Sequence, residues 1–178
     1  MITTYIDRER DLKKFTLLWI VKRSFVDYLS RTPGSSIELG GDATRAIDGS
    51  FAFPLSSAHT VEPGGRLVEL RFAGKVAFSA HDGVLDLSLE NPWITAGPEG
   101  SIISVVDPED HSARADLAEV PGVVPRFVNS EIEFSFAEPA LTALGAELLG
   151  RMYLPGIALD PLRVVSREAV WPDFKTSA

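Results

Sequence analysis

The chain has 178 residues, of which 45% are apolar, so it can bury a sizeable core as one domain or at most two small ones. Its 25 acidic and 17 basic residues give a net charge of −8, which disfavours binding to nucleic acid or anionic lipid in the absence of a basic cluster, and none is present. Cysteine is absent, which excludes disulfide frameworks, thiolate zinc sites and iron–sulfur clusters.

The first residues carry no pattern for membrane insertion or export. The apolar run from Phe15 to Val21 is far shorter than the roughly 20 residues of a membrane span. Residues 6–11 mix charges of both signs, whereas a signal peptide is basic and then apolar and ends at a small-residue cleavage site. We predict no membrane span and leave two localisations open, the cytoplasm or a processed or truncated exported protein.

The first predicted element is a helix from Asp11 to Leu29. Its apolar residues recur at helical spacing, and Pro33-Gly34 ends the segment. Ser24 and Tyr28 are four residues apart, which places their side chains on one face of the helix, one turn from each other. The spacing therefore predicts a hydroxyl beside the phenol of Tyr28.

The middle of the chain has the alternation of β-structure. Strands are predicted at 49–53 and 68–72, and Asp82-Gly83 is a strong hairpin signal. Pairing across this turn forms one apolar face and leaves His81 on the other face, at the last rung beside the turn. The predicted pairs are Ala80 with Leu85, Phe78 with Leu87 and Val76 with Leu89.

Later elements complete a mainly β fold. A second helix is predicted to open near Pro139 and end at Gly150, and the segment 121–125 is predicted to be a loop. We predict an antiparallel β-sandwich or barrel-like domain with two helices, one N-terminal and one near the C-terminus. The further strands are expected at 93–95, 102–106, 114–117, 131–136 and 159–165.

Several motifs follow one another in an order typical of a known family. They are Ser-Phe-x-x-Tyr in the first helix, Phe-x-Gly-x-Val-x-Phe before the hairpin, His-x-Gly-x-Leu-x-Leu at the hairpin, and then Asn-Pro. Near the C-terminus stand Leu-Thr-x-x-Gly-Ala, Gly-Arg-Met-Tyr and Leu-Asp-Pro. In this order the chain resembles the HtaA-type haem-binding domain of actinobacterial haem-uptake proteins. The resemblance covers about residues 18–165, and we interpret residues 1–178 as a single HtaA-like domain.

The resemblance implies a haem site rather than a catalytic site. In the family, a tyrosine of the first helix ligates ferric haem iron and a hairpin histidine hydrogen-bonds its oxygen, and the matching residues are Tyr28 and His81. By the same correspondence Ser24 faces the haem edge or a propionate, Tyr153 is a pocket aromatic, and Met152 stands where the family commonly has an aromatic residue. The implied cofactor is ferric haem b, and the implied role is haem capture, transfer or intracellular handling, with another haem-binding protein as donor or acceptor.

The chemistry of this pair is consistent with the implied role. A phenolate is a hard anionic ligand that prefers ferric to ferrous iron. An ordinary phenol ionises only near pH ~10, so the iron and a hydrogen-bonding imidazole must both favour the phenolate. Reduction of the iron or protonation of the pair would then release haem, which suits a carrier.

Departures from the family pattern keep an alternative open. Met152 replaces an aromatic residue, Ala80 precedes the histidine where glycine is usual, and residues 31–40 differ from the family's glycine- and tryptophan-rich stretch. The alternative is an HtaA-like fold that has lost haem and binds another apolar ligand or a protein partner. A haem enzyme would need a distal acid or base, which the sequence does not nominate, and His59 and His111 are not expected to contact iron. The oligomeric state is left open.

Overall fold

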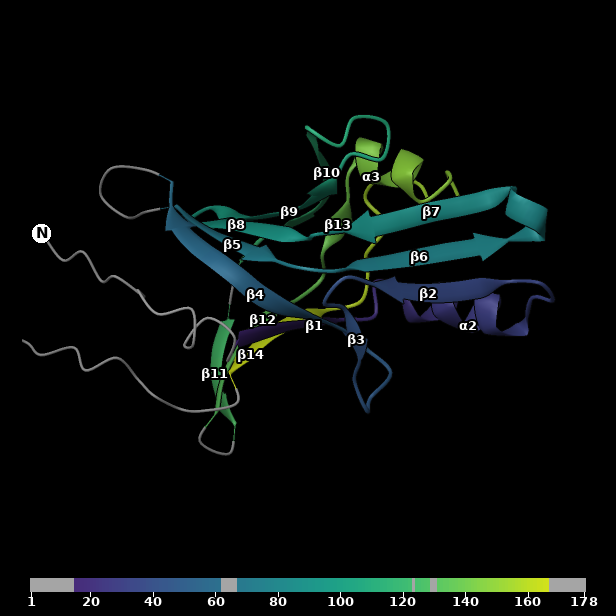
Figure 1. The fold of residues 1–178 in the computed structure, drawn as a ribbon. Helices are drawn as coiled ribbons and strands as arrows, with labels where there is room; N and C mark the ends of the chain where they lie inside the picture. The colour runs from purple at the N-terminus through teal and green to yellow at the C-terminus, as the bar shows by residue number, and fades with distance from the viewer. Residues whose placement is uncertain (1–14, 62–66, 123, 129–130, 167–178) are drawn as a thin grey trace, which may run out of the picture.

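Antiparallel strands make up most of the protein (Figure 1), whose computed structural model describes residues 15–61, 67–122, 124–128 and 131–166. Within these residues, eleven strands form one curled half-barrel sheet, three strands form a small sheet, and there are two helices and a 3₁₀ turn. The prediction of a mainly β fold with two helices is confirmed. Among the described residues, no helix is long and apolar enough to cross a membrane.

The large sheet runs in the order β11-β12-β14-β1-β4-β5-β8-β9-β10-β13, with β3 beside β4. Its strands are β1 (Phe15–Trp19), β3 (Thr44–Arg45), β4 (Phe51–Thr60), β5 (Val68–Phe72), β8 (Trp93–Gly97), β9 (Gly100–Val106), β10 (Arg114–Val120), β11 (Val124–Val128), β12 (Glu131–Phe136), β13 (Ala140–Leu141) and β14 (Leu162–Ser166). The small sheet contains β2 (Ser36–Gly40), β6 (Lys75–Ala80) and β7 (Leu85–Glu90). The helical elements are α2 (Arg23–Arg31), η1 (His81–Gly83) and α3 (Ala143–Leu148).

The N-terminal helix is shorter than predicted. Phe15–Trp19 forms β1, which pairs with β14 and β4, and the helix α2 begins only at Arg23. The spacing of the apolar residues in this stretch fits both a helix and a strand. Pairing on both sides of β1 favours the strand because it buries Leu17 and Trp19. Residues 11–14 of the predicted helix lie outside the described residues.

The hairpin register is confirmed at every predicted pair. Ala80 pairs with Leu85, Phe78 with Leu87 and Val76 with Leu89. The strand ends at Ala80, however, and His81 starts η1 with a positive φ of 53°. His81 therefore lies in the turn itself rather than at the last rung.

The chain passes directly between the small sheet and the large one where β2 continues into β3, β5 into β6 and β7 into β8 (Figure 1), and the last two of these joints are fastened to each other. At the β5–β6 joint Gly74 has φ +125°, and a Cβ there would lie 2.5 Å from the Ala43 nitrogen, so only glycine fits. At the β7–β8 joint Asn91 donates its N–H to Gly74 O (2.7 Å), and its Oδ1 accepts from Gly74 N (2.9 Å). The Gly and Asn-Pro motifs thus fasten the two joints together.

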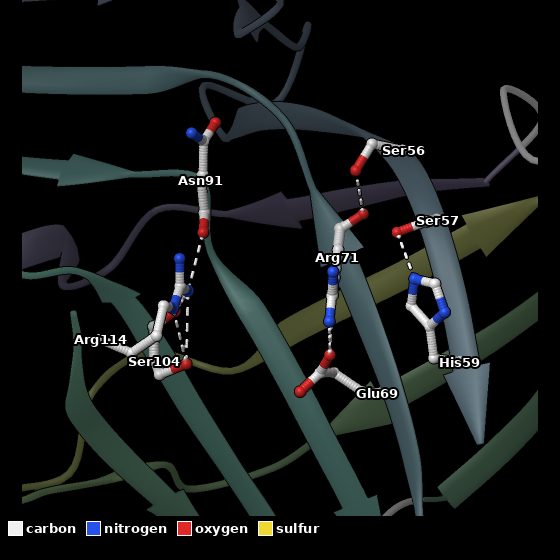
Figure 2. Close-up of polar contacts among 8 residues, drawn as sticks. All are labelled: Ser56, Ser57, His59, Glu69, Arg71, Asn91, Ser104 and Arg114. Atoms are coloured by element: carbon white, nitrogen blue, oxygen red, sulfur yellow. Dashed lines mark hydrogen bonds and ion pairs between the residues drawn. The ribbon is translucent and has the colours of Figure 1, made fainter. Parts of the chain in front are cut away.

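A guanidinium of β10 reinforces the β7–β8 joint (Figure 2). Arg114 Nη2 donates to Asn91 O (2.8 Å) and to Ser104 O (2.7 Å). The guanidinium carbons of Arg71 and Arg114 lie 4.0 and 4.1 Å from the Trp93 ring centroid, at cation–π distance. Burial lowers the pKa of Arg114 to about 10, so the residue remains charged at neutral pH.

The helix α3 is docked on β10 by the Leu-Thr-x-x-Gly-Ala motif. It starts at Ala143, later than predicted, because Leu141 belongs to β13 and Thr142 is the N-cap, its Oγ1 accepting from Gly145 N (2.8 Å). Gly145 abuts the carbonyl of Leu117, where a Cβ would lie only 2.0 Å from the oxygen. Gly150, after the helix, has φ +65°, the left-handed conformation that favours glycine at a helix C-terminus.

Other predicted boundaries are less accurate. The predicted loop 121–125 is wrong at its end, because β11 begins at Val124 and pairs with β12. The last strand begins at Leu162 rather than at residue 159, and β2 was not predicted. The predicted strands at 68–72 and 131–136 have the observed bounds. Those at 93–95, 102–106 and 114–117 coincide with parts of β8, β9 and β10, and the one at 49–53 begins two residues before β4.

Candidate functional site

The structure brings the phenol of Tyr28 and the imidazole of His81 into contact, although they are 53 residues apart in sequence. Tyr28 Oη lies 2.5 Å from His81 Nε2, and the ring centroids are 6.1 Å apart with the planes tilted by 43°. The pair shares one proton: either the phenol donates to Nε2, or Nε2–H donates to the phenol oxygen. Both side chains are exposed, Tyr28 by 39%.

The helix α2 presents Tyr28 because its opposite face is buried. Phe25, Val26 and Leu29 point into the core, and the Phe25 ring packs on Phe78 of β6 at 5.2 Å between centroids. Thr32 Oγ1 donates to Tyr28 O (2.9 Å) and thereby closes the last turn of the helix. The small sheet thus supports the helix beneath the tyrosine.

The hairpin tip presents His81 through a left-handed turn. His81 and Asp82 both have φ +53°, which is a rare conformation for residues with a Cβ and is least unfavourable for Asn, Asp and His. Val84 N donates to His81 O (3.1 Å) and closes the turn. The buried Ala80 and Leu85 hold the strand ends below it, so the imidazole projects beyond the sheet toward α2.

The other predicted site residues lie on α2 and on the segment after α3, without joining the pair. Ser24 is exposed on α2, one turn before Tyr28, as the spacing predicts. Met152 is 42% exposed, and Tyr153 is half-buried against the core with Lys22 Nζ 5.4 Å from its ring centroid. Among the described contacts, only His81 hydrogen-bonds the Tyr28 hydroxyl.

The segment after α3 approaches both the hairpin and the start of α2. A Cβ at Gly150 would lie 3.5 Å from Leu85 Cδ1 of β7, and Lys22 Nζ donates to Ala158 O (2.8 Å). This segment exposes the apolar side chains Met152, Leu154 and Ile157, and Val84 is exposed at the hairpin tip. Apolar surface is therefore available on the elements that neighbour the phenol–imidazole pair.

A cavity of about 340 Å³ opens near the start of α2 but is not lined by this pair. Its wall is charged: Arg163 pairs with Asp48 (2.8 Å), and Arg23 and Asp160 also line it. The amide of Ser50 holds the pKa of Asp48 below its usual range. This lining suits water and ion pairs rather than an apolar macrocycle.

The remaining histidines and carboxylates do not form a competing metal site. His59 Nε2 lies 2.9 Å from Ser57 Oγ on the large sheet (Figure 2), and His111 is exposed in the β9–β10 loop. In the part of the chain that the structure describes, no three side chains of His, Asp or Glu converge to hold a metal ion. The donor set of the site is thus a phenol and an imidazole.

The model of the HtaA family, described as Htaa, matches residues 14–165. The chain belongs to the HtaA family. The structure of this HtaA-family chain is similar to the C-terminal domain of HtaA from Corynebacterium glutamicum, with a TM-score of 0.70, 20% identity, and coverage of 85% of this chain and 94% of that one.

Two further structures have the same fold. The N-terminal domain of HtaA from Corynebacterium glutamicum gives a TM-score of 0.65 with 24% identity, covering 85% of this HtaA-family chain and 96% of that one. The heme binding protein HtaB from the same organism gives a TM-score of 0.57 with 19% identity, covering 85% of this chain and 91% of that one. A comparison with curated proteins finds no match.

Some residues around the site were not predicted from sequence. Lys22 and Asp160 connect the start of α2 to the C-terminal segment, and Asn91 fastens the sheet joint. The Leu-Asp-Pro and Asn-Pro motifs contain two of these residues, but motif spacing alone does not reveal their partners. Lys22 carries no signal in the sequence that distinguishes it from a surface lysine.

Proposed function

We propose that this chain binds one ferric haem through the Tyr28 oxygen, with His81 hydrogen-bonded to that oxygen. The observation that carries the proposal is the 2.5 Å contact between Tyr28 Oη and His81 Nε2 on an exposed surface. Membership of the HtaA family and the likeness to a heme binding protein support it. We further propose that residues 1–178 form a single domain.

The donor set suits haem chemically. Ferric haem would supply a hard Lewis-acidic iron, which the anionic phenolate oxygen of Tyr28 could hold. Tyr28 must lose its proton to bind, and His81 Nε2 stands where it can receive that proton or donate its own N–H to the phenolate. The imidazole would thus stabilise the ligand without touching the iron.

The surroundings suit a macrocycle that enters and leaves. The phenol is exposed, and the exposed apolar side chains of Met152 and Val84 are available for a porphyrin face. The Ser24 hydroxyl, on the same helix face as Tyr28, is available for a propionate or the haem edge. An open site favours haem capture or transfer, in exchange with another haem-binding protein, and we propose no catalytic step.

Hemin titration of the purified chain tests the proposal. The wild type should give a saturable one-to-one spectrum of high-spin ferric tyrosinate, and Tyr28→Phe should abolish it because only the ligating oxygen is removed. His111→Ala, in the exposed β9–β10 loop, is the control and should keep the spectrum. His81→Ala should bind about tenfold more weakly, because a hydrogen bond to a charged group contributes about 1.5 kcal/mol.

Two outcomes would contradict the assignment. An unchanged spectrum in Tyr28→Phe would exclude Tyr28 as the ligand. A wild type that takes up no hemin at micromolar concentration would instead favour an HtaA-like fold that binds another apolar ligand or a protein partner.

A further inference from the structure

The helix that carries Tyr28 lacks a side-chain cap of its own. Its N-cap residue is Lys22, whose side chain makes no cap hydrogen bond, and the first turn contains no acidic residue. The helix has only nine residues, and most of them, including Ser24, Val26 and Asp27, are weak helix formers. Its start must therefore be held by contacts from elsewhere in the fold.

Asp160 supplies those contacts from the other end of the chain. Its Oδ2 accepts a hydrogen bond from Arg23 N, the first amide of α2, at 2.6 Å. Its backbone N–H donates to Val21 O (2.9 Å), and its carbonyl accepts from Trp19 Nε1 (2.9 Å). A carboxylate at this position also faces the positive end of the helix dipole.

The backbone just before α2 is strained, which makes these contacts consequential. Val21 has φ +66°, and Lys22 N donates to Ile20 O (2.8 Å), so the three residues form a γ-turn with a β-branched residue at its centre. The Asp160 N–H bond to Val21 O is made at this turn. The direction in which α2 leaves β1 is therefore fixed by the Leu-Asp-Pro segment.

We propose that Asp160 is a positioning residue for the phenol–imidazole pair. By capping α2 it holds Tyr28, five residues or about 7.5 Å further along the helix, against His81. The bond from Lys22 Nζ to Ala158 O ties the same segment to the helix a second time. The consequence for haem rests on the proposed function, whereas the effect on the pair is a property of the chain itself.

Imidazole ¹⁵N chemical shifts test the effect on the pair without haem. In the wild type, His81 Nε2 should differ from an averaged, solvent-exposed imidazole, for which His111 is the internal reference. Asp160→Ala removes the carboxylate and keeps both backbone bonds, and it should move the His81 shifts toward those of His111. Asp107→Ala is the matched control: it removes a comparable carboxylate bond, to Glu109 N (2.8 Å) in the β9–β10 loop, and should leave His81 unchanged.

A second variant removes the same bond from the donor side. Arg23→Pro deletes the N–H at the first helical position, where proline is tolerated, and the extended backbone of Lys22 is compatible with a following proline. It should move the His81 shifts in the same direction as Asp160→Ala does, toward those of His111. It also tests the proposal by itself if Asp160→Ala does not fold.

Hemin titration then measures the consequence for haem. Asp160→Ala should weaken hemin binding about fivefold, the loss typical of one missing helix cap. His81 shifts that stay at wild-type values in both folded variants would overturn the proposal. A wild type that takes up no hemin would refute the proposed function, while the nitrogen shifts would still decide the role of Asp160.

Discussion

Replacing Gly145 with alanine has two opposing effects on stability, one from helix propensity and one from close packing. Inside a helix, alanine is favoured over glycine by about 1 kcal/mol, so preference alone predicts a more stable protein. The added Cβ, however, would lie 2.0 Å from Leu117 O and 2.9 Å from its carbonyl carbon, roughly 1 Å or more inside ordinary contact. The conflicting atoms are backbone, so α3 must retreat from β10.

The structure indicates how much this retreat costs. Thr142 N donates to Leu117 O (3.1 Å) and Thr142 Oγ1 donates to Asp116 O (2.6 Å), at the irregularity of β10 that turns these carbonyls toward the helix. Weakening these bonds costs about 1 kcal/mol each, and overpacking typically costs about 1–3 kcal/mol. We expect Gly145→Ala to lower the free energy of unfolding by about 2–3 kcal/mol despite the gain in helix preference.

Urea unfolding followed by tryptophan fluorescence and circular dichroism measures this difference. Ala143→Gly, at an exposed position of the same helix, is the control and should cost at most about 1 kcal/mol. A Gly145→Ala protein as stable as the wild type, or more stable, would refute the close-approach reasoning.

Two further predictions concern the sheet joint and an acidic side chain. Gly74→Ala should lower the urea midpoint of unfolding much more than Gly83→Ala does. Both positions have a positive φ, but only at Gly74 would the new Cβ meet backbone, 2.5 Å from Ala43 N. Equal decreases of the urea midpoint in the two variants would contradict this reasoning. The folded-state pKa of Asp48 is lowered, chiefly by the Ser50 amide, so its stabilisation is present above the unfolded pKa of about 3.9 and is lost as pH falls through the folded value. Melting temperatures of Asp48→Asn should accordingly fall below the wild type at pH 6 and converge with it in strong acid, and a gap that persists unchanged in acid would contradict the assignment.

Local patterns predicted the parts of the fold that local chemistry determines. Alternation on both sides of Asp82-Gly83 predicted the register of the β6–β7 hairpin correctly at all three predicted pairs, because register follows from the turn and from burial of one face. The same reasoning failed at Phe15–Trp19, whose apolar spacing fits a helix until pairing with β14 and β4 is known. It also missed β2, because the sequence Ser-Ile-Glu-Leu-Gly becomes a strand only through pairing with β6.

The residues of the candidate site and the hydrogen bond between them were predicted, but the packing that brings them together was not. Tyr28 and His81 were named from the family resemblance, whereas their 2.5 Å contact depends on how α2 packs on the small sheet through Phe25 and Phe78. The contact between Asp160 and Arg23 joins residues 137 apart in sequence, and no periodicity encodes such a distance. Long-range contacts of this kind are what a single sequence conveys least.

The joint at Gly74 and Asn91 holds the β6–β7 hairpin, and with it His81, to the large sheet. Tyr28 is attached differently: the bonds from Asp160 and Lys22 fasten the start of α2 to the C-terminal segment, and Phe25 packs the helix on Phe78 of β6. The phenol and the imidazole thus reach their 2.5 Å contact through separate attachments to the rest of the fold. A change at either attachment would alter the distance between them, so this distance reports on the fold at both places.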